Sequence, residues 1–87
     1  MLKRGIICYL ATREGPAEIA YDLAELVALL RNIGIEAAAT VIQHREPDLN
    51  YLFGEGKIHE VRERVGREGY QAVVFNRELS PRQVKAL

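Results

Sequence analysis

A short glycine turn with a lysine, Gly54-Glu55-Gly56-Lys57, carries the clearest chemical signal in this chain. The turn comes about ten residues after an apolar, β-branched run ends, and it opens a segment with helical periodicity. Backbone N–H groups at a helix start, two residues without side chains and a lysine can together hold an anion such as a phosphate. We therefore take Gly54, Gly56 and Lys57 as candidate anion-binding residues. The alternative is that both glycines serve only turn geometry and close packing.

The turn does not fit the two well-defined nucleotide-binding motifs. A P-loop would need a glycine in place of Tyr51 and a serine or threonine in place of Ile58. A dinucleotide-binding fingerprint would need a third glycine in place of His59 and a strand directly before the turn. The sequence therefore predicts neither magnesium-nucleotide hydrolysis nor NAD binding at this turn.

Three arginines follow apolar runs that read as strands: Arg13, Arg45 and Arg77. In open α/β sheets the loops after the carboxyl ends of the strands form the ligand-binding edge. Together with Lys57, the three arginines could therefore form one shared anion site. Each arginine is followed by a glutamate, so solvated or locally paired charges are the alternative.

Other side chains offer little chemistry. His44, His59 and Cys8 show no metal-ligand spacing, and one cysteine cannot build a zinc site. The carboxylates lie mainly on predicted helix surfaces at salt-bridge spacing, and no nucleophile with its base can be assigned. We expect neither a metal nor a catalytic residue in this chain.

The candidate residues need a scaffold, and apolar periodicity alternates between strand and helix. Strands are predicted at residues 5–10, 35–43 and 70–75, and helices begin near Pro16, Glu55 and Ser80. Gly34 and Gly69 are placed to end the first two helices. The order β-α-β-α-β-α predicts an α/β fold, a small three-layer domain with a parallel sheet and right-handed crossovers.

The third helix has a well-marked start and a short body. In Ser80-Pro81-Arg82-Gln83, Ser80 and Gln83 can form a capping box. The helix then runs only to Leu87, whereas isolated helices need roughly 12–15 residues to persist. We therefore expect one domain over residues 1–87, a fragment truncated in its third helix and lacking a fourth strand.

Composition narrows the class of protein. The chain has 87 residues, of which 48% are hydrophobic, so a small globular domain is expected rather than disorder. Twelve basic residues balance twelve acidic ones, which argues against a domain that binds nucleic acid through excess positive charge alone. The single cysteine, Cys8, lies in an apolar run and is expected to be buried in a reduced, cytoplasmic protein. No apolar run approaches the roughly 20 residues that cross a membrane.

Three segments together resemble the N-terminal domain of HflX-type GTPases. They are Thr40–Pro47 (TVIQHREP), Tyr51–Glu60 (YLFGEGKIHE) and Val73–Gln83 (VVFNRELSPRQ). The family pattern has T-V-x-Q-x-R-x-x-P, then Y-x-G-x-G-K-x-x-E, then a strand ending in D/N-x-E-L-S-P-x-Q. The resemblance covers nearly the whole chain in order. Phe53 stands where a smaller aliphatic residue is expected.

The resemblance implies a cytoplasmic GTP-binding protein that associates with the large ribosomal subunit. Its N-terminal domain would help to dock on ribosomal RNA and could bind a purine nucleotide. GTP and magnesium would belong to a downstream G domain, so this fragment itself would be no enzyme and hold no cofactor. The residues that match the family pattern are Gln43, Arg45, Pro47, Tyr51, Gly54, Gly56, Lys57, Glu60, Glu78, Leu79, Ser80, Pro81 and Gln83.

Two alternatives stay open. The chain could be a free-standing nucleotide- or anion-binding module with no ribosome partner. It could also be a purely structural domain that stabilises or regulates its neighbour. Substitution of Lys57 or Arg45 would affect ligand binding in the first case and leave it unchanged in the second.

Overall fold

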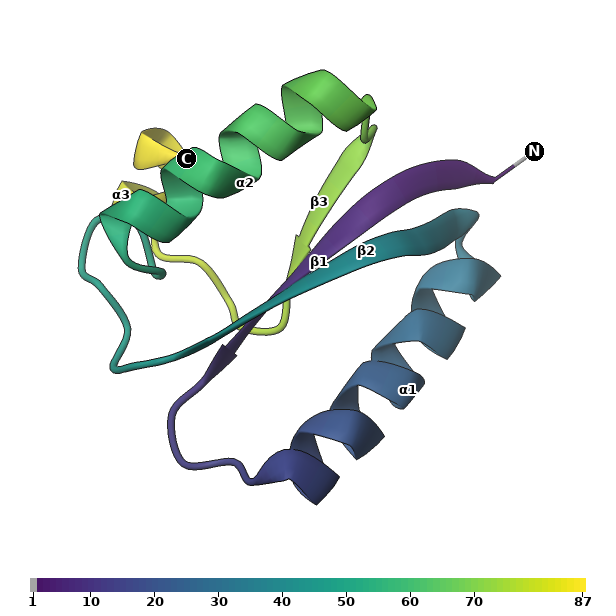
Figure 1. Ribbon diagram of the computed structural model, residues 1–87, viewed down its shortest axis with the longest axis horizontal. Coiled ribbons are helices and arrows are strands. Elements are labelled where there is room, and N and C mark those ends of the chain that lie inside the picture. The colour runs from purple at the N-terminus through teal and green to yellow at the C-terminus, as the bar shows by residue number, and fades with distance from the viewer. Residues whose placement is uncertain (1) are drawn as a thin grey trace.

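The computed structural model describes residues 2–87, which form a parallel sheet with helices on both faces (Figure 1). The elements are β1 (Lys3–Ala11), α1 (Pro16–Asn32), β2 (Ile35–His44), α2 (Glu55–Glu68), β3 (Ala72–Phe75) and α3 (Pro81–Ala86). The strand order is β2-β1-β3, and β1 pairs in parallel with both neighbours. The predicted α/β class and parallel three-layer arrangement are confirmed.

Strand β1 forms the centre of the molecule because both of its faces are apolar. Helix α1 lies on one face of the sheet, and α2 and α3 lie on the other (Figure 1). Ile6, Cys8 and Leu10 pack into the core with α2, whereas Tyr9 and Ala11 pack with α1. A continuous apolar run is what a strand covered on both sides requires. Cys8 is fully buried, as predicted.

The helix boundaries follow the predicted signals. Pro16 occupies the first turn of α1, and Gly34, which follows the C-cap residue Ile33 of that helix, has a φ of 86°. Gly69 ends α2 with a φ of 71°. Both glycines thus adopt the left-handed conformation that other residues rarely take. At α3, both hydrogen bonds of the predicted capping box are present.

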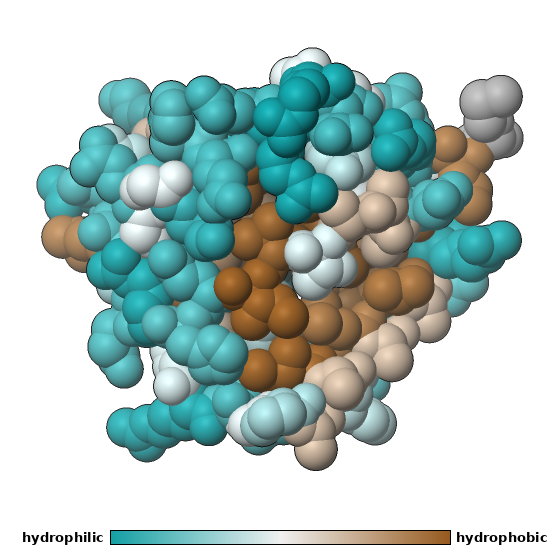
Figure 2. Space-filling view, viewed as in Figure 1, coloured by the Kyte–Doolittle hydropathy of each residue, from teal (hydrophilic) through white to brown (hydrophobic). Residues whose placement is uncertain are grey.

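The apolar face of α1 is broader than the sheet that it covers. Ile19 and Leu30 are buried, whereas Val27 is 40% exposed and Leu29 is 56% exposed. In Figure 2, apolar side chains gather in the middle of the visible face, between more hydrophilic areas. Among residues 2–87, no helix is long and apolar enough to cross a membrane.

Candidate functional site

The candidate site is built around the loop of residues 45–54, here called the β2–α2 loop. Asp48 organises this loop, because its Oδ1 accepts hydrogen bonds from the backbone N–H groups of Asn50 and Tyr51, both at 2.8 Å. Asp48 and Leu52 also exchange backbone hydrogen bonds of 2.8 and 3.0 Å. The backbone bonds from Tyr51 and Asn50, with a contribution from the charge of Arg45, lower the pKa of Asp48. A charged Asp48 therefore favours this conformation.

Two apolar residues fix the loop in the core. Leu52 is 3% exposed and Phe53 is fully buried, where its ring meets Phe75 edge-on at a centroid distance of 6.1 Å. Leu52 adopts a φ of 65°, which is unfavourable for a residue with a Cβ. Burial of its side chain offsets that cost. Phe53, the departure from the family pattern, is thus part of the core.

Gly54 lies in close contact with two neighbouring side chains, and its backbone conformation is an ordinary one. Its φ is −62°, and its N–H donates to Oε1 of Gln43 at 2.8 Å. A Cβ at this position would lie 2.7 Å from Nη1 of Arg45 and 3.3 Å from Nε2 of Gln43. A Cβ at Gly56 would meet nothing within 4 Å. The two glycines of the turn therefore differ: only Gly54 makes room for a neighbour.

The positive groups at this site come from the loop and from the first turn of α2. The guanidinium of Arg45 lies against Gly54, and its Nε donates to the carbonyl of Glu46 at 2.8 Å. Lys57 lies in the next residues of α2, with its Nζ 3.0 Å from a carboxylate oxygen of Glu60. The positive end of the α2 dipole adds to both charges. This arrangement can attract an anion through partly exposed groups.

Arg77 belongs to a different cluster, between the ends of β1 and β3. Its Nη2 lies 3.6 Å from Oε2 of Glu14 and donates to the hydroxyl of Thr12 at 3.1 Å. Glu14 accepts bonds from the backbone N–H groups of Arg13 and Thr12. These bonds, that from Arg13 first, lower the pKa of Glu14 to about 2. Arg77 is therefore occupied within the protein, while the side chain of Arg13 is exposed.

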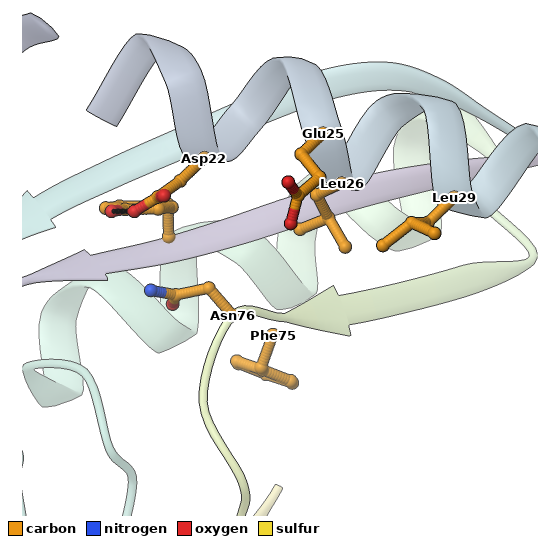
Figure 3. A pocket seen from close by; sticks show the side chains of 7 residues that line it. Asp22, Glu25, Leu26, Leu29, Phe75 and Asn76 are labelled. Carbon is orange, nitrogen blue, oxygen red and sulfur yellow. Dashed lines mark hydrogen bonds between the residues drawn. The ribbon is translucent and has the colours of Figure 1, made fainter. Parts of the chain in front are cut away.

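An acidic hollow of about 350 Å³ lies beside this second cluster (Figure 3). Asp22, Glu25, Leu26 and Leu29 of α1 face Phe75 and Asn76 at the end of β3, with Tyr9 also lining the hollow. The hydroxyl of Tyr9 donates to Oδ2 of Asp22 at 2.6 Å. Burial first, and this hydrogen bond second, raise the pKa of Tyr9. The carboxylates make the hollow unfavourable for an anion.

The structure thus places the predicted site residues in two groups. Arg45, Gly54, Gly56 and Lys57 lie where the β2–α2 loop joins α2, whereas Arg13 and Arg77 lie at the loops after β1 and β3. Within residues 2–87, no hydrogen bond or ion pair joins the two groups. Likewise, no three His, Cys, Asp or Glu side chains of this range could hold a metal ion.

The sequence reasoning did not find the Tyr9–Asp22 pair or the acidic hollow. A signal for it existed, because Asp22 interrupts the apolar face of α1 between Ile19 and Leu26. A carboxylate on the helix face that packs against the sheet is costly to bury without a hydrogen bond, so a polar partner is expected on the strand that it faces. Tyr9 on the α1 side of β1 supplies that partner.

Most of this chain matches a known family of protein domains. Residues 20–87 match the family described as "GTP-binding GTPase N-terminal". This chain belongs to that family.

Individual relatives narrow the comparison. The GTPase HflX of Escherichia coli (strain K12) is 37% identical over 67 residues, which are 76% of this chain and 16% of that protein. The GTPase HflX of Thermococcus kodakarensis is 40% identical over 60 residues, 69% of this chain and 14% of that protein. The chain therefore spans about a sixth of the length of these relatives. The predicted resemblance to an HflX N-terminal domain is confirmed.

Proposed function

We propose that this chain is a docking domain of an HflX-type GTPase and contacts the RNA of the large ribosomal subunit. The contact would be made by the β2–α2 loop and the first turn of α2. GTP and magnesium would be bound, and GTP hydrolysed, in a G domain outside these 87 residues. Such a protein would act in the cytoplasm.

One observation carries this proposal: the guanidinium of Arg45 lies on Gly54 at the start of α2. Helix starts and arginines are common partners of RNA and DNA phosphates, and they position a protein without reading sequence. The domain has no net charge, so its contact would rest on individual cationic side chains rather than on bulk charge. Lys57 would add a second positive group, from the first turn of that helix.

Charge reversal in the natural-length protein tests the proposal. Arg45→Glu is expected to weaken cosedimentation with the large subunit by about tenfold or more, and Lys57→Glu by less, because Lys57 already pairs with Glu60. Arg67→Glu near the other end of α2 makes the same change in net charge and is the control. Binding should fall with salt less steeply in the Arg45 variant. Unchanged cosedimentation of Arg45→Glu would remove the loop from this role.

A second candidate function is the binding of a free purine nucleotide at the same helix start. The close approach of Arg45 to Gly54 also supports a phosphate site of this kind. Titration of the 87-residue chain with GTP and ATP would then give saturable binding that is lost in Arg45→Ala. Absence of binding to both nucleotides would leave RNA as the anionic partner.

If the domain is only structural, neither Arg45 nor Lys57 would matter for binding. Core substitutions such as Val61→Ala, at a residue 4% exposed, would then be the changes that impair the parent protein, at a cost of about 1–3 kcal/mol in the free energy of unfolding. Thermal unfolding measured beside cosedimentation separates this case from the other two.

A further inference from the structure

Gln83 is a buried polar side chain that connects α3 with the β2–α2 loop. It is 8% exposed, and its Nε2 donates to the backbone carbonyl of Asp48 at 2.8 Å. Its Oε1 accepts from the N–H of Ser80 at 2.9 Å, and its own N–H donates to the Ser80 hydroxyl at 3.2 Å. One side chain thus completes the capping box of α3 and also reaches a loop 35 residues away.

The bond from Gln83 reaches the residue that organises the loop. The carbonyl of Asp48 accepts from both Leu52 and Gln83, while its carboxylate accepts from the loop's own N–H groups. The ends of the loop are held separately: the Arg45 N–H donates to Ala11, and the Gly54 N–H to Gln43. Gln83 therefore holds the middle of the loop from outside.

Helix α3 is attached to the protein largely by polar contacts. Val84 on this helix is 61% exposed, whereas Nη2 of Arg62 in α2 donates to the carbonyl of Ala86 at 2.6 Å. A six-residue helix has little stability of its own. The bond between Gln83 and Asp48 should therefore matter for the helix and for the loop alike.

We propose that Gln83 is a positioning residue, which holds the β2–α2 loop and Arg45 in the conformation that binds an RNA phosphate. This inference rests on the function proposed above and names the residue that sets the geometry of that site. Displacement of α3 would remove the bond to Asp48 and leave Arg45 on a looser loop. The loop and α3 then act as one unit, although the sequence separates them by a strand and a helix.

Two variants of the natural-length protein separate the loop contact from the helix cap. Gln83→Glu keeps an oxygen that can accept from Ser80 but replaces the donor that faces the Asp48 carbonyl. Ser80→Ala removes the hydroxyl that caps α3 and leaves the amide of Gln83 in place. Should Gln83→Glu fail to fold, Gln83→Met, which has similar length, removes both the donor to Asp48 and the acceptor for the Ser80 N–H and is tested by the same two readouts.

The readouts are hydrogen exchange of the peptide that covers residues 45–54 and cosedimentation with the large ribosomal subunit. We expect Gln83→Glu to speed exchange in this peptide by about tenfold and to weaken cosedimentation by roughly threefold to tenfold. Ser80→Ala should change both values by less than about twofold, because the Asp48 contact survives.

The outcomes distinguish this inference from the proposed function. Unchanged exchange of the loop in Gln83→Glu overturns the inference, whatever the binding result. Weaker binding in Arg45→Glu with unchanged binding in Gln83→Glu also overturns it and leaves the docking function standing. If neither variant weakens binding, the docking function fails and this role of Gln83 in positioning a binding residue fails with it.

Discussion

The loops after β1 and β3 differ from the β2–α2 loop, although all three carry the same Arg-Glu pair. After β1, the carboxylate of Glu14 lies beside the guanidinium of Arg77, from the loop after β3, rather than beside that of Arg13. After β2, Arg45 bonds the backbone carbonyl of Glu46 and packs on Gly54. Two oppositely charged residues that are adjacent in sequence therefore need not pair with each other. The sequence alone does not show which charged side chains form ion pairs within the protein and which stay accessible to a ligand.

The cluster between β1 and β3 keeps its arginine paired and half-buried, whereas the start of α2 carries an exposed Arg45 beside Lys57 and Glu55. Arg77 is held by Glu14 and Thr12, and the hollow beside it is lined by Asp22 and Glu25. The start of α2 instead presents Arg45, Lys57 and a helix dipole. The comparison favours the β2–α2 loop as the anion-binding part of the sheet edge. The predictions below test that contrast.

The largest effect is expected for Phe53→Ala, which would detach the β2–α2 loop from the core. Phe53 is fully buried and contacts Phe75, so truncation should lower the free energy of unfolding by about 3–5 kcal/mol. Leu49→Ala in the same loop is the matched control, because Leu49 is 71% exposed and should change stability by less than about 0.5 kcal/mol. Denaturant unfolding measures both. Equal effects would mean that the loop is not held by the core.

A moderate effect is expected when the two glycines of the turn are compared. Gly54→Ala should displace the Arg45 guanidinium and weaken ribosome binding several-fold, because the new methyl group would lie 2.7 Å from its Nη1. Gly56→Ala meets open space inside α2 and should raise stability by about 0.5–1 kcal/mol without loss of binding. Cosedimentation and thermal unfolding check the pair. The reverse order of binding losses would contradict the packing argument.

A smaller effect is expected from pH at the cluster between β1 and β3. The pKa of Glu14 is lowered from 4.5 to about 2 by hydrogen bonds from backbone N–H groups, so the folded state favours its charged form. Its contribution is fully present above pH 4.5 and is lost as the pH falls towards 2. Glu14→Gln should therefore flatten this part of a stability–pH curve. A curve that keeps its slope in the variant would assign the effect to another group, such as Asp48.

Local signals in the sequence predicted much of the fold. The apolar run of β1, the left-handed glycines Gly34 and Gly69 and the capping box at Ser80 each depend on nearby residues. The third strand is predicted to begin at Tyr70 but begins at Ala72, and Tyr70 packs into the core just before it. The anion-binding role of Arg45 and Lys57 stays a prediction.

The sequence by itself determined the alternation of strands and helices, the helix starts and ends and the family, because these depend on short-range periodicity and on motif spacing. Only the tertiary structure decided the partners of the polar side chains. It paired Tyr9 with Asp22, Glu14 with Arg77 and Gln83 with Asp48. Such pairs form where folding brings polar groups together, so a local pattern can mark one member of a pair, as Asp22 on the apolar face of α1 does, but does not name its partner.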